Sequence, residues 1–174
     1  MIGFRHADPR FPFLWETAAQ PGARWHADGT GPVQYLAETP DGAWAELLRH
    51  EGITDPTDLD GLRRALWAVD LPEPPETRPG LSTTDLLGGT DSWPACRAEA
   101  ERLRRGGAVG LVVPSAALST GPSGYHVKGG IQPGPERGES VGVLFGPRPD
   151  LVGWAACAAG RPRADLLGRV RPLG

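Results

Sequence analysis

Three polar residues that stand far apart in the sequence have side chains suited to chemistry: Arg24, Glu46 and Ser115. Arg24 precedes Trp25, so its stem could lie against the indole while its guanidinium reaches a phosphate. Glu46 falls on an otherwise apolar helix face, where a carboxylate must be paired or must reach solvent. Such a carboxylate could stabilise positive charge at an anomeric carbon and accept a proton from a nucleophile.

Structural roles compete with these chemical ones. Arg24 could form a surface salt bridge and Glu46 a structural ion pair. Tyr35 lies in a short apolar run, where its ring either packs in the core or stacks on a flat heterocycle. Ser115 follows an apolar run without a Gly-x-Ser-x-Gly elbow, which favours a hydrogen-bonding serine, or one that simply closes a strand, over a nucleophile.

Local patterns place these residues on short elements. A glycine-rich turn leads into a predicted strand at 33–37, and Thr39 or Asp41 could cap a helix over 41–51, with Glu46 at the margin of its apolar stripe. This alternation predicts an α+β fold in which short mixed strands and short helices form one compact domain over residues 1–174. The other predicted elements are strands at 2–6, 65–71, 108–113, 141–145 and 151–156, and helices at 58–64, 83–87 and 94–105, the first capped by Asp58 and the last by Ser92.

Composition excludes several classes of function. Of the 174 residues 39% are hydrophobic, and the net charge of −3 is scattered along the chain, which argues against binding of duplex nucleic acid. Cys96 and Cys157 are isolated, so neither a metal site nor a disulfide framework is expected. Neither a signal-peptide pattern nor a membrane-spanning run occurs, and we therefore expect a cytoplasmic protein that does not bind membranes. The sequence leaves open whether the protein forms a homo-oligomer.

Other common site patterns do not occur. The histidines lack the spacing of metal ligands, and the glycine pairs lack the context of a dinucleotide or phosphate loop. Most of the six tryptophans should be core residues, although Trp25 and Trp93 could line a pocket.

Taken together, Arg24, Glu46 and Ser115 and the phrases around them resemble the RES-domain family, which is named for an arginine, a glutamate and a serine. The resemblance covers residues 4–135 and rests on the order of its phrases. These are Phe4-Arg5, Arg24-Trp25, Gly31-Pro32-Val33, Tyr35, Ala43-Trp44-Ala45-Glu46 and Val113-Pro114-Ser115-Ala116.

The resemblance implies a fold related to the ADP-ribosyltransferase scaffold. It also implies a toxin of a bacterial toxin–antitoxin pair that splits the nicotinamide–ribose bond of NAD with water or phosphate, and that is silenced by an antitoxin with a helix-turn-helix DNA-binding domain. NAD would be the substrate, and no cofactor is expected. Two alternatives stay open: a catalytically silent binding module, and a serine hydrolase that uses Ser115 with His126 or His50.

The same resemblance implies roles for single residues. Arg24, with Arg5, would hold the pyrophosphate or a ribose, and Tyr35 would stack on nicotinamide. Glu46 would stabilise the oxocarbenium-like transition state. Ser115 would orient the ribose or the amide.

One segment departs from the family pattern. Many members follow their serine with an asparagine and an Asn-Pro step, whereas this chain contains no asparagine and reads Gly-Tyr-His-Val-Lys-Gly-Gly over 124–130. Residues 125–130 could form one wall of the pocket, with His126 or Lys128 replacing the asparagine. Alternatively, they form a solvated surface loop.

Overall fold

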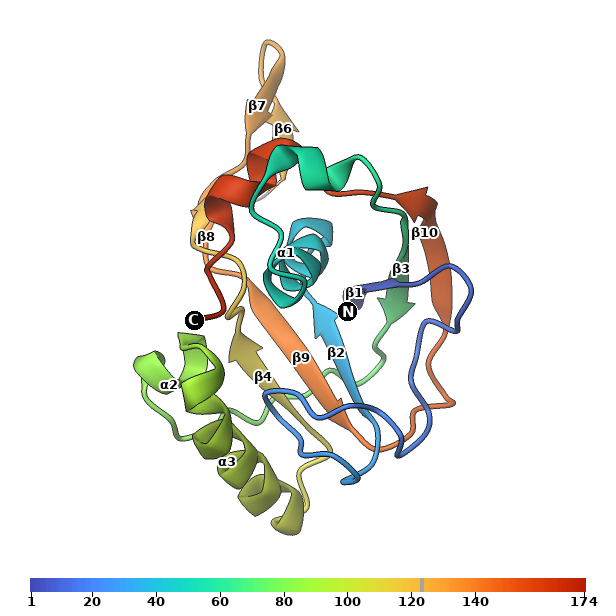
Figure 1. The fold of residues 1–174 in the computed structure, drawn as a ribbon, viewed down its shortest axis with the longest axis vertical. Coiled ribbons are helices and arrows are strands. Elements are labelled where there is room, and N and C mark those ends of the chain that lie inside the picture. The colour runs from blue at the N-terminus through green and yellow to red at the C-terminus, as the bar shows by residue number, and fades with distance from the viewer. Residues whose placement is uncertain (123) are drawn as a thin grey trace.

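The centre of the fold is a six-stranded sheet (Figure 1). The computed structural model describes residues 1–122 and 124–174. The strand order is β10-β3-β1-β2-β9-β4, and each neighbouring pair is antiparallel. The strands are β1 (Ile2–Ala7), β2 (Val33–Ala37), β3 (Arg64–Asp70), β4 (Gly110–Pro114), β9 (Ser140–Phe145) and β10 (Gly153–Gly160).

Helix α1 (Pro40–His50) lies across one face of this sheet (Figure 1). It begins where Thr39, with extended backbone, accepts a hydrogen bond from the Gly42 N–H to Oγ1 at 3.1 Å. Pro40 occupies the first turn, where no amide donor is needed. The predicted helix is confirmed, with Thr39 and not Asp41 as its cap. Leu47 and Leu48 are buried, so one side of α1 faces the core.

Helices α2 (Thr83–Leu87) and α3 (Trp93–Arg105) lie beside β4 (Figure 1). Ser82 caps α2 by accepting the Asp85 N–H at 3.1 Å. Both predicted helices are confirmed. Ser92 precedes α3 as predicted, but its side chain makes no capping bond and instead donates to the Gly89 carbonyl at 2.7 Å.

Several predicted elements need correction. The helix predicted at 58–64 is a 3-10 helix, η1 (Pro56–Leu59), and its cap is Asp55, not Asp58. The strand predicted at 151–156 starts and ends later in the sequence and is longer, because β10 continues along β3 through two register shifts. The α+β class is confirmed, although the strands of the main sheet are antiparallel and not mixed. We did not predict η2 (Thr90–Ser92), η3 (Ala164–Arg169), or the short strands β5 (Gly121–Pro122), β6 (Tyr125–Val127), β7 (Ile131–Pro133) and β8 (Glu136–Arg137).

Within 1–122 and 124–174, no helix has the length and apolar character that crossing a membrane would require.

Candidate active site

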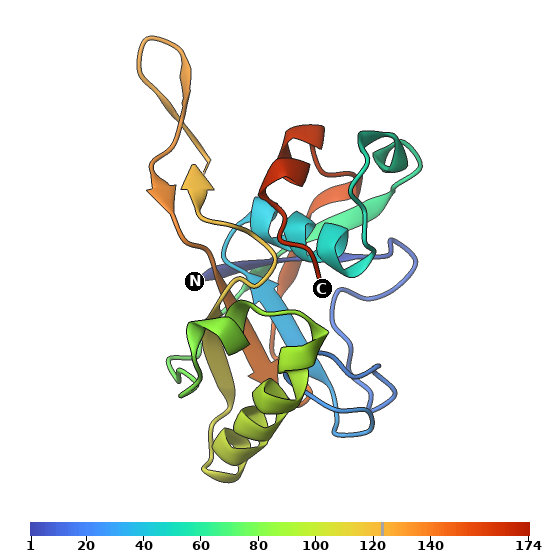
Figure 2. The ribbon, with the colours of Figure 1, turned by 60° about the vertical axis from the view of Figure 1, so that its left-hand side comes forward.

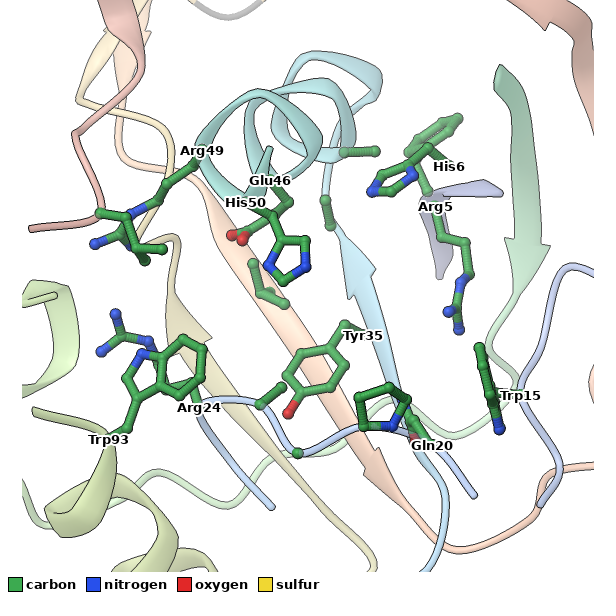
Figure 3. A pocket seen from close by; sticks show the side chains of 18 residues that line it. Arg5, His6, Trp15, Gln20, Arg24, Tyr35, Glu46, Arg49, His50 and Trp93 are labelled. Atoms are coloured by element: carbon green, nitrogen blue, oxygen red, sulfur yellow. The ribbon is translucent and has the colours of Figure 1, made fainter. Parts of the chain in front are cut away.

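A cavity of about 410 Å³ opens beside α1 (Figure 3). The loop that follows β1 forms one side, and β1 and β2 form the floor. Four of the predicted site residues reach it, namely Arg5, Arg24, Tyr35 and Glu46. The remaining residues of its wall are Phe4, His6, Trp15, Gln20, Pro21, Gly22, Ala23, Ala37, Ala43, Arg49, His50, Trp93, Val141 and Leu173.

Glu46 lies near the middle of this cavity and is partly buried (Figure 3). Burial raises the pKa of Glu46 above its ordinary value of 4.5. The positive charges of Arg49 and Arg24 oppose this rise, as do hydrogen bonds from the Ser115 hydroxyl and the Ala117 backbone N–H. The carboxylate thus has two donors from residues 115–117 while it lines the open space of the cavity.

Ser115 lies behind Glu46 and does not line the cavity. Only 2% of its surface is exposed, and its hydroxyl accepts the Leu118 N–H at 3.0 Å while it donates to the Glu46 carboxylate. The structure therefore brings Ser115 to the site as a support for Glu46. The described bonds of its side chain include none to a histidine, which disfavours the serine-hydrolase alternative.

Arg24 and Arg49 converge beside Glu46. Arg24 is 8% exposed, and its Nη1 donates to the Asp85 carbonyl at 3.1 Å. Its Nη2 makes a short hydrogen bond to the Gly88 carbonyl. Arg49 donates to the same Gly88 oxygen from Nη2 at 2.7 Å. Among the described residues, neither arginine forms a salt bridge with Glu46, so this corner of the cavity carries surplus positive charge.

Tyr35 presents its ring to the cavity, and its hydroxyl is already bound. The hydroxyl accepts the Trp25 backbone N–H at 3.2 Å and lies 2.9 Å from His26 Nδ1. His26 Nε2 lies 3.0 Å from the Pro21 carbonyl, so His26 donates there and accepts from Tyr35. Burial raises the pKa of Tyr35, which keeps the phenol neutral. A ligand in the cavity can therefore contact the face of the Tyr35 ring.

Trp25 does not line the cavity, contrary to the expectation from the sequence. It is 2% exposed and packs in the core with Val33, Cys96 and Leu111. Its backbone N–H, and not its indole, supports the site through Tyr35. Trp93, the other tryptophan that we expected near the pocket, does line it.

Arg5 stands on the opposite side of Glu46 from Arg24 (Figure 3). Its Nη1 donates to Gln34 Oε1 at 2.6 Å, and burial lowers its pKa to about 10. Partial burial of the neighbouring His6 likewise lowers its pKa, to about 3. The cavity therefore has a cationic group at each side and a carboxylate between them.

The segment 125–130 lies outside the cavity. Tyr125–Val127 pairs with Ile131–Pro133 to form a hairpin, and this hairpin projects from the body of the protein (Figure 2). His126 and Lys128 are exposed on it and are absent from the cavity wall. The expectation that this segment forms one wall of the cavity is wrong in this structure, and the surface-loop alternative describes it.

Several wall residues were not predicted. Arg49 lies one turn from Glu46 on the same helix, and that spacing could have identified it. His50, which the sequence suggested only as a partner of Ser115 in a hydrolase, has the corresponding four-residue spacing from Glu46 and also lines the cavity. Trp15 and Leu173 carry no sequence signal for a site, because the fold alone brings them to the cavity. In the described part of the chain, no three His, Cys, Asp or Glu side chains are grouped so as to hold a metal ion.

The fold and this site define a RES-type α+β protein. The family model described as "RES domain" matches residues 2–125, and the chain belongs to that family. A solved structure with a similar fold is the M. tuberculosis MbcT–MbcA toxin–antitoxin complex. Its matching chain has a TM-score of 0.62 and 19% sequence identity, over 96% of this chain and 86% of that one. No curated protein matches the sequence.

Proposed function

We propose that this protein cleaves the N-glycosidic bond between nicotinamide and ribose in NAD, with water or phosphate as the acceptor. The observation that carries the proposal is the Glu46 carboxylate, which faces a cavity of about 410 Å³ while Ser115 and Ala117 hold it from behind. A carboxylate in that setting suits the stabilisation of an oxocarbenium-like transition state.

The reaction needs little more than this charge and the correct position of the substrate. The nicotinamide nitrogen of NAD is cationic, so the bond to C1′ breaks with its electron pair moving to nitrogen, and neutral nicotinamide leaves. The positive charge that develops on the ribose faces Glu46. An oxygen of water or phosphate then bonds to C1′. When water attacks, its proton passes to Glu46 and from there to solvent.

The rest of the cavity suits a dinucleotide. Arg24 and Arg49 supply positive charge for the pyrophosphate, and Arg5 supplies it on the other side of the cavity. The exposed ring face of Tyr35 can stack on nicotinamide. No cofactor is required in this scheme, because NAD is itself the substrate.

We further propose that the protein is a cytoplasmic toxin with an antitoxin partner that carries a helix-turn-helix DNA-binding domain. Family membership supports this role, and the similar solved structure is itself a toxin–antitoxin complex. Induced expression with and without the product of the adjacent open reading frame tests it. Growth arrest and NAD loss that the neighbour relieves would support the role; normal growth and normal NAD would count against it.

The activity is tested with purified protein and NAD, with and without phosphate, by chromatographic separation of nicotinamide and the ribosyl products. We expect nicotinamide release from the wild type. Glu46→Gln is the matched control, since it preserves the shape of the side chain and removes its charge. A folded wild-type protein that releases no nicotinamide under either condition would instead be a silent binding module.

A further inference from the structure

The C-terminal segment 169–173 is bound to the turn that supports Glu46. The Arg171 backbone N–H donates to the Ala117 carbonyl at 2.7 Å. The Nη1 of the same residue donates to the carbonyls of Ser115 at 2.8 Å and Leu118 at 2.5 Å. Arg171 thus holds three of the four residues of the 115–118 turn.

The opposite side of this turn holds the carboxylate. The Ser115 hydroxyl and the Ala117 N–H both donate to Glu46, and the Leu118 N–H donates to the Ser115 hydroxyl. The carbonyls of the turn therefore point to Arg171 while its donors serve the site. A movement of the turn would shift both donors to Glu46 together.

The segment is built into the fold around it. Arg49 Nε donates to the Pro172 carbonyl at 3.3 Å, and Leu173 forms part of the cavity wall. Gly89 has no room for a side chain, since a Cβ there would lie 2.1 Å from the Leu173 carbonyl oxygen. These contacts fix the position of the segment from several sides.

We propose that Arg171 is a positioning residue for Glu46, acting through the 115–118 turn. Residue 171 lies outside the part of the chain that the RES family model matches, 2–125, so the family motif does not include it. The catalytic consequence rests on the proposed function, whereas the effect on Glu46 itself can be measured without turnover.

Arg171→Met keeps the apolar stem and removes the donors. Arg169→Met is the matched control: it removes an arginine from the same segment, but one whose guanidinium donates to the Pro122 and Ser119 carbonyls. The measurements are the pKa of Glu46 from its carboxyl carbon resonance and the hydrogen exchange of the Ala117 and Leu118 amides. The pH profile of NAD cleavage and the thermal midpoint complete the set.

Other groups also act on this titration. Arg49 and His50 on α1, and Arg24 and Tyr35 across the cavity, face Glu46 and are unchanged in both variants (Figure 3). We expect Arg171→Met to raise the pKa of Glu46, because weaker donors stabilise the carboxylate less. We also expect faster exchange at Ala117 and Leu118. For a displaced carboxylate, kcat should fall roughly 10- to 100-fold with KM for NAD nearly unchanged.

Arg169→Met should resemble the wild type in all of these quantities. A lower thermal midpoint for Arg171→Met with an unchanged pKa of Glu46 and unchanged exchange would overturn the proposal. A raised pKa with unchanged exchange would also overturn it, since the lost charge alone would then explain the shift. If Arg171→Met does not fold, Arg171→Lys takes its place. We then expect smaller changes in the same directions, and an unchanged pKa of Glu46 with unchanged amide exchange would overturn the proposal.

An absence of nicotinamide release by the wild type would refute the proposed function alone, because the pKa of Glu46 and the amide exchange would still decide the role of Arg171.

Discussion

Arg24 and Arg49 donate to the same carbonyl oxygen, that of Gly88, although the first lies in a loop and the second on α1. Their like charges are therefore held close together beside the cavity. Burial lowers the pKa of Arg49, and the charge of Arg24 lowers it further. Bringing the two guanidiniums together costs free energy, which an anion bound between them and the cavity would offset.

The first prediction is that ADP-ribose stabilises the protein through this pair. At a concentration of about 100 times its dissociation constant, it should add about 2.7 kcal/mol to the free energy of unfolding. Arg49→Met should lower the affinity for ADP-ribose at least tenfold. Arg105→Met, on the exposed end of α3, should leave this affinity unchanged. Thermal shift titrations measure both. Equal affinity in the two variants would contradict a role of Arg49 in anion binding.

A second prediction concerns the charge of Glu46. Glu46→Gln should lower kcat by about two orders of magnitude or more, the range found for acid-base and electrostatic groups. Because burial raises the pKa of Glu46, the fold loses stability as the pH rises from the ordinary value of 4.5 through the raised pKa, and the loss is complete above it. The variant should thus be as stable as the wild type at neutral pH, or more stable. Lost stability with retained specific activity would indicate that the Glu46 carboxylate has a structural and not a catalytic role.

The pH dependence of activity should report the same group. The proposed cleavage of NAD uses the ionised carboxylate, so kcat/KM should fall as the pH decreases through the pKa of Glu46. The midpoint should lie above the ordinary value of 4.5, because burial is the largest influence on this pKa. A rate profile measured on protein shown to be folded at each pH tests this. A midpoint below 4.5 would mean that the bonds from Ser115 and Ala117 outweigh burial.

Ser115→Ala separates support from nucleophilic catalysis. The substitution leaves the buried Leu118 N–H without its acceptor, and we expect a loss of about 1 to 3 kcal/mol in stability. Activity should fall but persist, since Glu46 keeps the Ala117 N–H. Wild-type protein should also resist a fluorophosphonate that labels nucleophilic serines. Complete loss of turnover in a folded variant, together with labelling of Ser115, would favour a hydrolase.

His6 should make the fold sensitive to acid. The pKa of His6 is about 3 in the folded protein, against an ordinary value of 6.5. Between pH 3 and pH 6.5 His6 is therefore protonated in the unfolded chain and neutral in the folded protein. Stability should thus be lost as the pH falls from about 6.5, by about 2 kcal/mol at pH 5. His6→Gln should remove this loss, whereas His126→Gln, on the exposed hairpin, should not. Urea denaturation at pH 7.5 and 5 measures the difference.

The sequence by itself determined the elements that depend on neighbours along the chain. Thr39 and Pro40 start α1, and Ser82 starts α2, because capping and the fixed backbone angle of proline act within one helical turn. The order of short motifs also identified the family, and Arg24, Glu46 and Tyr35 do meet at one cavity.

Only the tertiary structure decided how the other residues serve the site. Trp25 lies in the core, Ser115 lies behind Glu46, and Lys128 lies on a hairpin outside the cavity. Arg171 reaches the 115–118 turn from more than fifty positions away. Burial and hydrogen-bond partners depend on contacts between distant segments, which local propensity does not encode, and for that reason the wall of the cavity and the support of Glu46 appear only once the chain is folded.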